Sequence, residues 1–197
     1  MVSEYTPSLS EVERLARDYN LIPVYRDILA DLETPVSAFA KVARGGYSFL
    51  LESVEGGERL ARYSFIGTDP YEVVEVDDAT DPLQVVEDHL RRYRVARVPG
   101  LPSFSGGAVG YLGYETARHY ERLPVPEADS LGVPLAVLMF VDTLLVFDHL
   151  KHRIRVVSHV HVNGEDLAAA YRRATDRIDA LVHRLMTPEP AWRIVHE

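Results

Sequence analysis

Two long apolar runs near the end of the chain constrain the fold most. Residues 135–147 and 153–162 are the longest stretches typical of β-strands, and a short turn at 148–152 joins them. Residues 165–186 follow with a helical period of apolar side chains. Elsewhere strands and helices do not alternate regularly, which argues against a doubly wound fold. We therefore expect an α+β fold with a largely antiparallel sheet and flanking helices.

Three further helices are indicated by their start signals. Ser10 and Glu13 form a candidate capping box for a helix over residues 8–20. Thr34 followed by Pro35 is a typical start for a second helix, which Gly45 and Gly46 would end. Asp81 and Pro82 begin a third helix that runs to about residue 93, with inward-facing side chains at Leu83, Val86 and Leu90.

The remaining strands have weaker signals. Residues 21–30 contain Pro23, which cannot donate to a sheet ladder and so predicts a strand near an edge. Residues 47–53 and 62–67 predict a β-hairpin across the turn at Gly56 and Gly57. Residues 71–76 predict another strand, and residues 106–114 a glycine-rich one. Together these elements form one domain over residues 1–186, and residues 187–197 read as a linker-like tail.

Composition excludes several classes of protein. The chain has 197 residues, a net charge of −9 and 47% apolar residues, which is ordinary for a globular protein. The acidic balance argues against partners with a phosphate backbone and against an anionic membrane surface. With no cysteine, disulfides and thiolate chemistry are absent. We see no signal peptide or spanning segment, and so expect a cytoplasmic protein that binds neither nucleic acid nor membrane.

Two patterns suggest sites only weakly. His159 and His161 share one face of a strand and could hold a metal if a third ligand arrived, but exposed strand histidines are commoner. The segment from 103 to 115 contains four glycines, yet it lacks the order of a dinucleotide fingerprint and has no Walker lysine. Close packing of backbones explains such glycines better than phosphate binding.

The predicted hairpin carries the most informative cluster of polar side chains. It brings Glu52 and Ser53, at the end of one strand, near Arg62 and Tyr63, at the start of the next. Such a set suits a zwitterion, because Glu52 can pair with an ammonium group and Arg62 with a carboxylate. Ser53 can donate or accept a hydrogen bond, and Tyr63 offers an aromatic wall. The simpler alternative is a cross-strand salt bridge between Glu52 and Arg62, which contributes little.

Four motifs resemble a known family. LLES at 50–53, RYSFIG at 62–67, GGAVGYLGYE at 106–115 and VFDH at 146–149 occur in the order and spacing of the N-terminal region of anthranilate synthase component I. The resemblance covers about residues 9–159. Aminodeoxychorismate synthase component I is a close relative, so the motifs identify the chorismate-utilising superfamily better than one enzyme.

The resemblance implies a regulatory and structural role. The complete subunit would be an αββα assembly in tryptophan biosynthesis, to which this region contributes part of the fold and no catalytic residue. It also implies that Ser53, Glu52, Arg62 and Tyr63 line a feedback site for L-tryptophan. The chain on its own is then not expected to act as a lyase.

The resemblance further implies partners. The chorismate-binding catalytic domain, with its Mg²⁺, would lie outside this chain, which itself holds no cofactor or metal. A separate glutamine amidotransferase subunit, component II, would supply ammonia. Two alternatives stay open: the N-terminal domain of aminodeoxychorismate synthase component I in folate biosynthesis, and a stand-alone amino-acid-binding or docking module.

Overall fold

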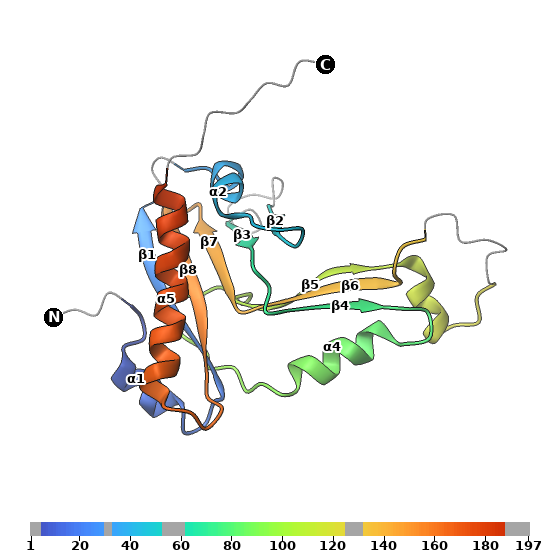
Figure 1. Cartoon of the computed structure of the whole chain (residues 1–197), viewed down its shortest axis with the longest axis horizontal. Helices are drawn as coiled ribbons and strands as arrows, with labels where there is room; N and C mark the ends of the chain where they lie inside the picture. Colours follow the sequence, from blue (N-terminus) through green and yellow to red (C-terminus); the bar gives the residue numbers. More distant parts are fainter. Residues whose placement is uncertain (1–4, 30–32, 53–61, 125–131, 188–197) are drawn as a thin grey trace, which may run out of the picture.

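The fold consists of two antiparallel sheets with helices packed against them (Figure 1). The computed structural model describes residues 5–29, 33–52, 62–124 and 132–187. Every strand ladder within it is antiparallel, which confirms the predicted α+β class. Where one sheet was expected, two are present.

The larger sheet has five strands in the order β1-β8-β7-β3-β2. Their bounds are β1 Leu21–Leu29, β2 Phe49–Leu51, β3 Tyr63–Gly67, β7 Thr143–Asp148 and β8 Arg153–His161. As Pro23 predicted, β1 lies at an edge, and its strand neighbour is β8. The helices α1 (Leu9–Leu15), α2 (Pro35–Val42) and α5 (Leu167–Met186) pack together with this sheet around the main hydrophobic core.

The smaller sheet has three strands in the order β4-β6-β5 and extends sideways from the larger one (Figure 1). Its strands are β4 Glu72–Val76, β5 Gly107–Leu112 and β6 Ala136–Val141. Helix α4 (Pro82–Leu90) packs on one face of it, and the 3₁₀ helix η1 (Tyr114–His119) follows β5. The chain therefore passes repeatedly between the two sheets, from β3 to β4 and back again from β6 to β7.

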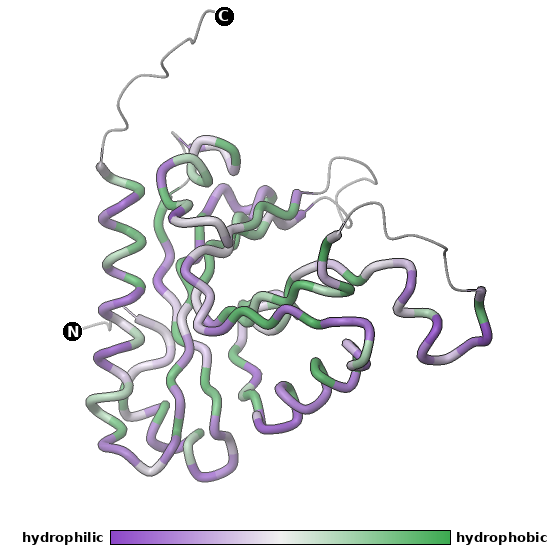
Figure 2. The backbone as a smooth tube through the Cα atoms, turned by 45° about the vertical axis from the view of Figure 1, so that its right-hand side comes forward, coloured by the Kyte–Doolittle hydropathy of each residue, from purple (hydrophilic) through white to green (hydrophobic). Residues whose placement is uncertain are grey.

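The apolar run 135–147 does not form the single strand that its sequence predicts. It divides into β6 and β7, which belong to different sheets, and only Asp142 separates them. Asp142 interrupts the run because its carboxylate needs polar partners, which it finds in Thr143 and His161. The following strand and helix, 153–162 and 165–186, are confirmed as β8 and α5. Figure 2 shows hydrophobic and hydrophilic segments alternating along α5, as expected for a helix that packs one face on a sheet.

The predicted helix caps are confirmed in two cases and wrong in one. Thr34 accepts a hydrogen bond from the backbone N–H of Ser37, and Asp81 accepts one from Leu83. The first helix instead uses Ser8 and Glu11 as its capping box, two residues earlier than predicted. Either serine could cap by sequence, and packing of Val12 into the core selects Ser8.

The buried face of α4 also differs from the prediction. Leu83 and Leu90 are 45% and 42% exposed, and Val85 packs with Val86 against the small sheet instead. The helix is rotated relative to the expected face because His89 stacks on Phe140, with ring centroids 4.2 Å apart. Within the described ranges, no helix has the length and apolar character needed to cross a membrane.

Candidate ligand site at the end of the β2–β3 hairpin

The predicted hairpin is present. Strands β2 and β3 pair antiparallel, with Leu50 opposite Ile66 and Leu51 opposite Phe65. Glu52 therefore follows the last paired residue of β2, and Arg62 precedes the first residue of β3. Ser53 lies outside the described residues, as does the predicted turn. The structure thus brings Glu52, Arg62 and Tyr63 to one end of the hairpin.

Arg62 pairs with Asp148 on β7 rather than with Glu52. Its Nε and Nη2 atoms lie 3.0 and 2.8 Å from the two carboxylate oxygens of Asp148, which is a bidentate ion pair. The Asp148 side chain is 1% exposed and that of Arg62 is 29% exposed. The simpler prediction of a Glu52–Arg62 salt bridge is wrong, because β7 lies beside β3 and supplies a better-buried carboxylate.

The ion pair sets the charge of both groups. Burial alone would raise the pKa of Asp148, but the hydrogen bonds and charge of Arg62 outweigh it and hold that pKa below its usual value. The same hydrogen bonds raise the pKa of Arg62. The guanidinium is therefore charged and fixed in direction, and its Nη1 atom makes no hydrogen bond with a described residue. Those N–H groups remain able to bind a ligand oxygen.

Aromatic rings support the other side of Arg62. Its guanidinium carbon lies 4.8 Å from the ring centroid of Tyr63, in a cation–π arrangement. Tyr63 also packs near Phe65, whose ring meets Phe104 edge to face at 5.2 Å. This aromatic row holds the start of β3 in place on the sheet face opposite α5.

A serine–histidine contact beneath this end escaped the sequence analysis. The hydroxyl of Ser64 lies 2.7 Å from Nε2 of His149, and Ser64 is 1% exposed. The two residues are 85 positions apart, and only the pairing of β3 with β7 brings them together. VFDH was noticed as a motif, but nothing local assigns a partner to Asp148 or His149. Because Ser64 is buried, the contact supports the strand pair rather than presenting a nucleophile.

Glu52 differs from its neighbours in having no fixed partner. It is exposed and makes no hydrogen bond or ion pair with a described residue. The hairpin end thus presents a free carboxylate, an oriented guanidinium and a tyrosine ring. That combination can bind an ammonium group, a carboxylate and an apolar body at once.

The two strand histidines are hydrogen-bonded to the break between β6 and β7. Nδ1 of His159 donates to the backbone oxygen of Asp142, and Nε2 of His161 lies 2.8 Å from its carboxylate. His159 is fully buried, and burial lowers its pKa. The Asp142 carboxylate lies where a third metal ligand would be needed, but it accepts a hydrogen bond from His161 instead. Among the described residues, no group of three acidic or histidine side chains is arranged to hold a metal ion.

The glycine-rich strand serves close packing, as predicted. A Cβ on Gly110 would lie 1.8 Å from the backbone oxygen of Val137 on β6. One on Gly106 would lie 2.9 Å from both the Val141 oxygen and the His159 ring. These positions therefore admit only glycine without displacement of the neighbouring strand.

Comparison with known proteins places the fold and these motifs in one family. The model for the chorismate binding enzyme family matches residues 46–193, which includes β2 to β8 and α5. The chain belongs to this family. The prediction that the chorismate-binding domain lies outside the chain stays a prediction, as does the boundary between domain and tail at residue 187.

The curated relatives are more specific. Anthranilate synthase component 1 of Acetivibrio thermocellus is 43% identical over 91% of this chain, and the probable anthranilate synthase component 1 of Schizosaccharomyces pombe is 41% identical over 96%. The chain spans 39% and 40% of the lengths of these relatives. Anthranilate synthase component I from Streptococcus pneumoniae TIGR4 shares the fold, with a TM-score of 0.55 over 83% of this chain at 22% identity.

Proposed function

We propose that this chain forms a non-catalytic regulatory and structural part of an anthranilate synthase large subunit, acting in tryptophan biosynthesis. Its support is the family match together with relatives that carry that name and align over nearly the whole chain. The remaining length of those relatives leaves room for the chorismate-binding part with its Mg²⁺. A glutamine amidotransferase subunit, component II, is the expected supplier of ammonia.

In this proposal the hairpin end contributes to a feedback site for L-tryptophan. Glu52 binds the ammonium group, Ser53 hydrogen-bonds to the ligand, and Tyr63 packs against its indole. The single observation that supports the site best is the bidentate hold of Asp148 on Arg62, which leaves Nη1 directed by a buried partner. Arg62 can then bind the ligand carboxylate without first losing side-chain freedom.

Regulation would work as a shift between two arrangements of the large subunit. Tryptophan inhibits only if it binds the inactive arrangement more tightly than the active one. A site at the end of a hairpin suits this mechanism. A ligand that contacts both strand ends and also another part of the subunit stabilises one position of that part relative to the hairpin.

The test is inhibition by L-tryptophan in the full-length subunit assembled with component II. We expect Glu52→Ala and Ser53→Phe each to raise the tryptophan concentration for half inhibition at least ~10-fold. A change of this size corresponds to the loss of one charge-assisted hydrogen bond. Uninhibited activity should stay close to that of the parent. Glu87→Ala, which removes an exposed carboxylate on α4, is the matched control and should leave inhibition unchanged. Unchanged inhibition in both site variants would reject the site.

The same assembly separates the two enzyme alternatives by its product. Formation of anthranilate from chorismate and glutamine supports the proposal. Formation of aminodeoxychorismate instead would assign the chain to folate biosynthesis. Calorimetric titration of tryptophan into this chain alone tests the stand-alone alternative. That alternative requires heat of binding, whereas no heat would show that the site needs another part of the subunit.

A further inference from the structure

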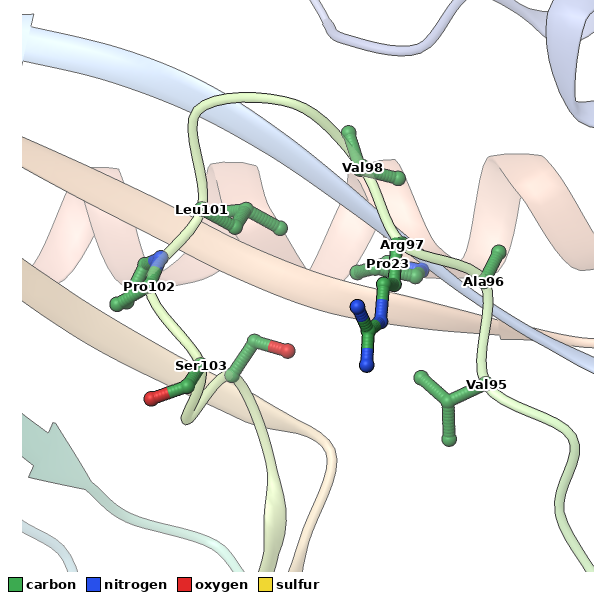
Figure 3. A pocket seen from close by; sticks show the side chains of 9 residues that line it. Pro23, Val95, Ala96, Arg97, Val98, Leu101, Pro102 and Ser103 are labelled. Atoms are coloured by element: carbon green, nitrogen blue, oxygen red, sulfur yellow. The ribbon is translucent and has the colours of Figure 1, made fainter.

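A cavity lies at the β1 edge of the five-stranded sheet. Its volume is about 440 Å³, within the range of small-molecule sites (Figure 3). Its lining comes from Pro23 on β1 and from the segment 95–105, which connects α4 to β5. Its lining contains none of the four residues proposed for tryptophan, although Phe104 on the same segment packs against Phe65 of β3.

The wall of this cavity is held in place at several points. Ala96 donates its backbone N–H to the oxygen of Leu21, 2.9 Å away, at the start of β1. Further along, Arg155 hydrogen-bonds to the oxygen of Gly100, and Phe104 packs against Phe65. The segment therefore keeps its shape without a ligand, and a ligand would not have to order it.

The chemistry of the lining is asymmetric. Among the described residues that line it, Arg97 is the only charged one, and its guanidinium projects toward the space between Val95 and Ser103 (Figure 3). Arg97 forms no hydrogen bond or ion pair with any residue in the described ranges. The nearby Arg94 and Arg155 do form such contacts, with the Asp18 backbone and the Asp27 carboxylate. A cation without an internal partner at the edge of a cavity is a ready anion-binding group.

Neutral groups complete the site. The hydroxyls of Ser103 and Ser105 border the cavity and have no hydrogen-bond partner among the described residues. The rest of the lining is apolar and comprises Pro23, Val95, Ala96, Val98, Leu101 and Pro102. The described part of the lining offers no carboxylate to receive an ammonium group.

We propose that this cavity binds a small carboxylate with an apolar body and no amine. Arg97 binds the carboxylate, the two serine hydroxyls donate to it, and the proline and aliphatic walls cover the apolar part. The lack of an acidic group discriminates against amino acids, because their ammonium would be desolvated without a partner. This preference is the reverse of that expected at Glu52.

The alternative for Arg97 is a purely internal role. It also borders a neighbouring cavity whose lining includes Glu11 and Asp18. In that alternative the guanidinium pairs with those carboxylates and is not available to bind a ligand.

The test uses the full chain labelled for NMR and titrated with benzoate at constant ionic strength. We expect saturable shifts of the Arg97 Nε–H signal and of backbone amides in 95–105. Benzamide, which has the same shape without the charge, should bind at least ~10-fold more weakly, as should Arg97→Gln for benzoate. Arg92→Gln, which removes an exposed arginine that does not line the cavity, should leave the affinity within about twofold.

Four results would overturn the proposal. Shifts that do not saturate, or equal affinity in Arg97→Gln, would show that Arg97 binds no carboxylate here. Equal affinity for inorganic phosphate would show a bare anion site without use of the apolar walls. Equal affinity for phenylalanine would show that the missing carboxylate does not select against amines. None of these results depends on inhibition by tryptophan, so the two proposals fail separately.

Discussion

The five-stranded and three-stranded sheets are built alike but covered very differently. Three helices pack with the larger sheet around a core that reaches from Val12 to Leu185. The smaller sheet has one helix and a core of four fully buried residues, which are Val76, Ala136, Leu138 and Phe140. Apolar side chains at its far end stay in contact with solvent, including Tyr111 and Leu112. Because the strand pairing is alike and the burial of apolar surface is not, we expect the larger sheet to be the more stable of the two.

The two sheets are also joined by a polar junction. Asp142 accepts hydrogen bonds from Thr143 and His161, and Arg177 on α5 lies 3.6 Å from the same carboxylate. Arg177 in turn donates to Ser158 on β8. The junction thus ties the small sheet to the better-covered one, and local opening of the small sheet is expected to stop there.

The largest effect should come from a core deletion in the small sheet. Phe140→Ala removes a fully buried ring that stacks on His89, at an expected cost of ~4 kcal/mol in the free energy of unfolding. Native-state hydrogen exchange should show faster exchange in β4, β5 and β6 while β1 and β8 stay protected. The matched variant Leu145→Ala in the large core, at ~3 kcal/mol, should lower protection in both sheets. If Phe140→Ala lowers both equally, the sheets form one cooperative unit.

The next effect tests the close approach of β5 to β6. Gly110→Ala places a Cβ 1.8 Å from the Val137 oxygen, so the two strands must separate. We expect the free energy of unfolding, measured by urea denaturation, to fall by ~2 kcal/mol. Gly46→Ala is the control, since no atom lies within 4 Å of its added Cβ. Equal midpoints for the two variants would contradict the close packing.

The junction should make stability depend on pH. The pKa of His159 is lowered by burial, so the unfolded chain binds its proton more readily than the folded one. Stability is then greatest above the ordinary value of 6.5 and falls as pH drops below it, by at most ~1.4 kcal/mol per pH unit. His159→Gln should flatten this slope between pH 7.5 and 5, whereas His183→Gln, on the exposed end of α5, should not. A parallel loss in the His159 variant would contradict the prediction.

A further loss is expected at lower pH from Asp142. Burial would raise its pKa, but the hydrogen bond of His161 and the charge of Arg177 hold it below the ordinary value of 3.8. Its contribution is therefore present above that value and is lost as pH falls through the lower folded value.

The smallest effect concerns a helix start at the edge of the large core. Thr34→Ala removes the cap on the Ser37 N–H and should cost ~1 kcal/mol, while Thr34→Ser should restore most of it. Thermal unfolding of the three proteins measures the difference. An alanine variant as stable as the parent would mean that solvent replaces the cap.

Local chemistry explains what was predictable from sequence. Thr34 and Asp81 each cap a helix through a bond to a residue two or three positions away, so the signal is contained in a short window. Pro23 likewise predicts an edge strand, because proline has no backbone N–H to donate to a neighbouring strand. The pairing of β2 with β3 was predictable from two apolar runs that a glycine pair separates in the sequence.

Long-range partners explain what was missed. Asp148 is 86 positions from Arg62, and no property of either residue selects the other. The division of the apolar run at Asp142 also depends on groups that arrive from β8 and α5. The ion pair that orients Arg62 was therefore decided by sheet order, because its two members lie in different motifs.

The pairing of β1 with β8 has a consequence during synthesis of the chain. Asp27 and Arg155 face each other across this ladder, yet they are 128 positions apart. At a typical ~10 residues per second, the ribosome needs on the order of ten seconds to make the second strand after the first. Throughout that interval β1 has left the ribosome without its sheet neighbour, exposing Ile22 and Val24. The large sheet can close only when translation has passed β8, so its formation is late for a strand made so early.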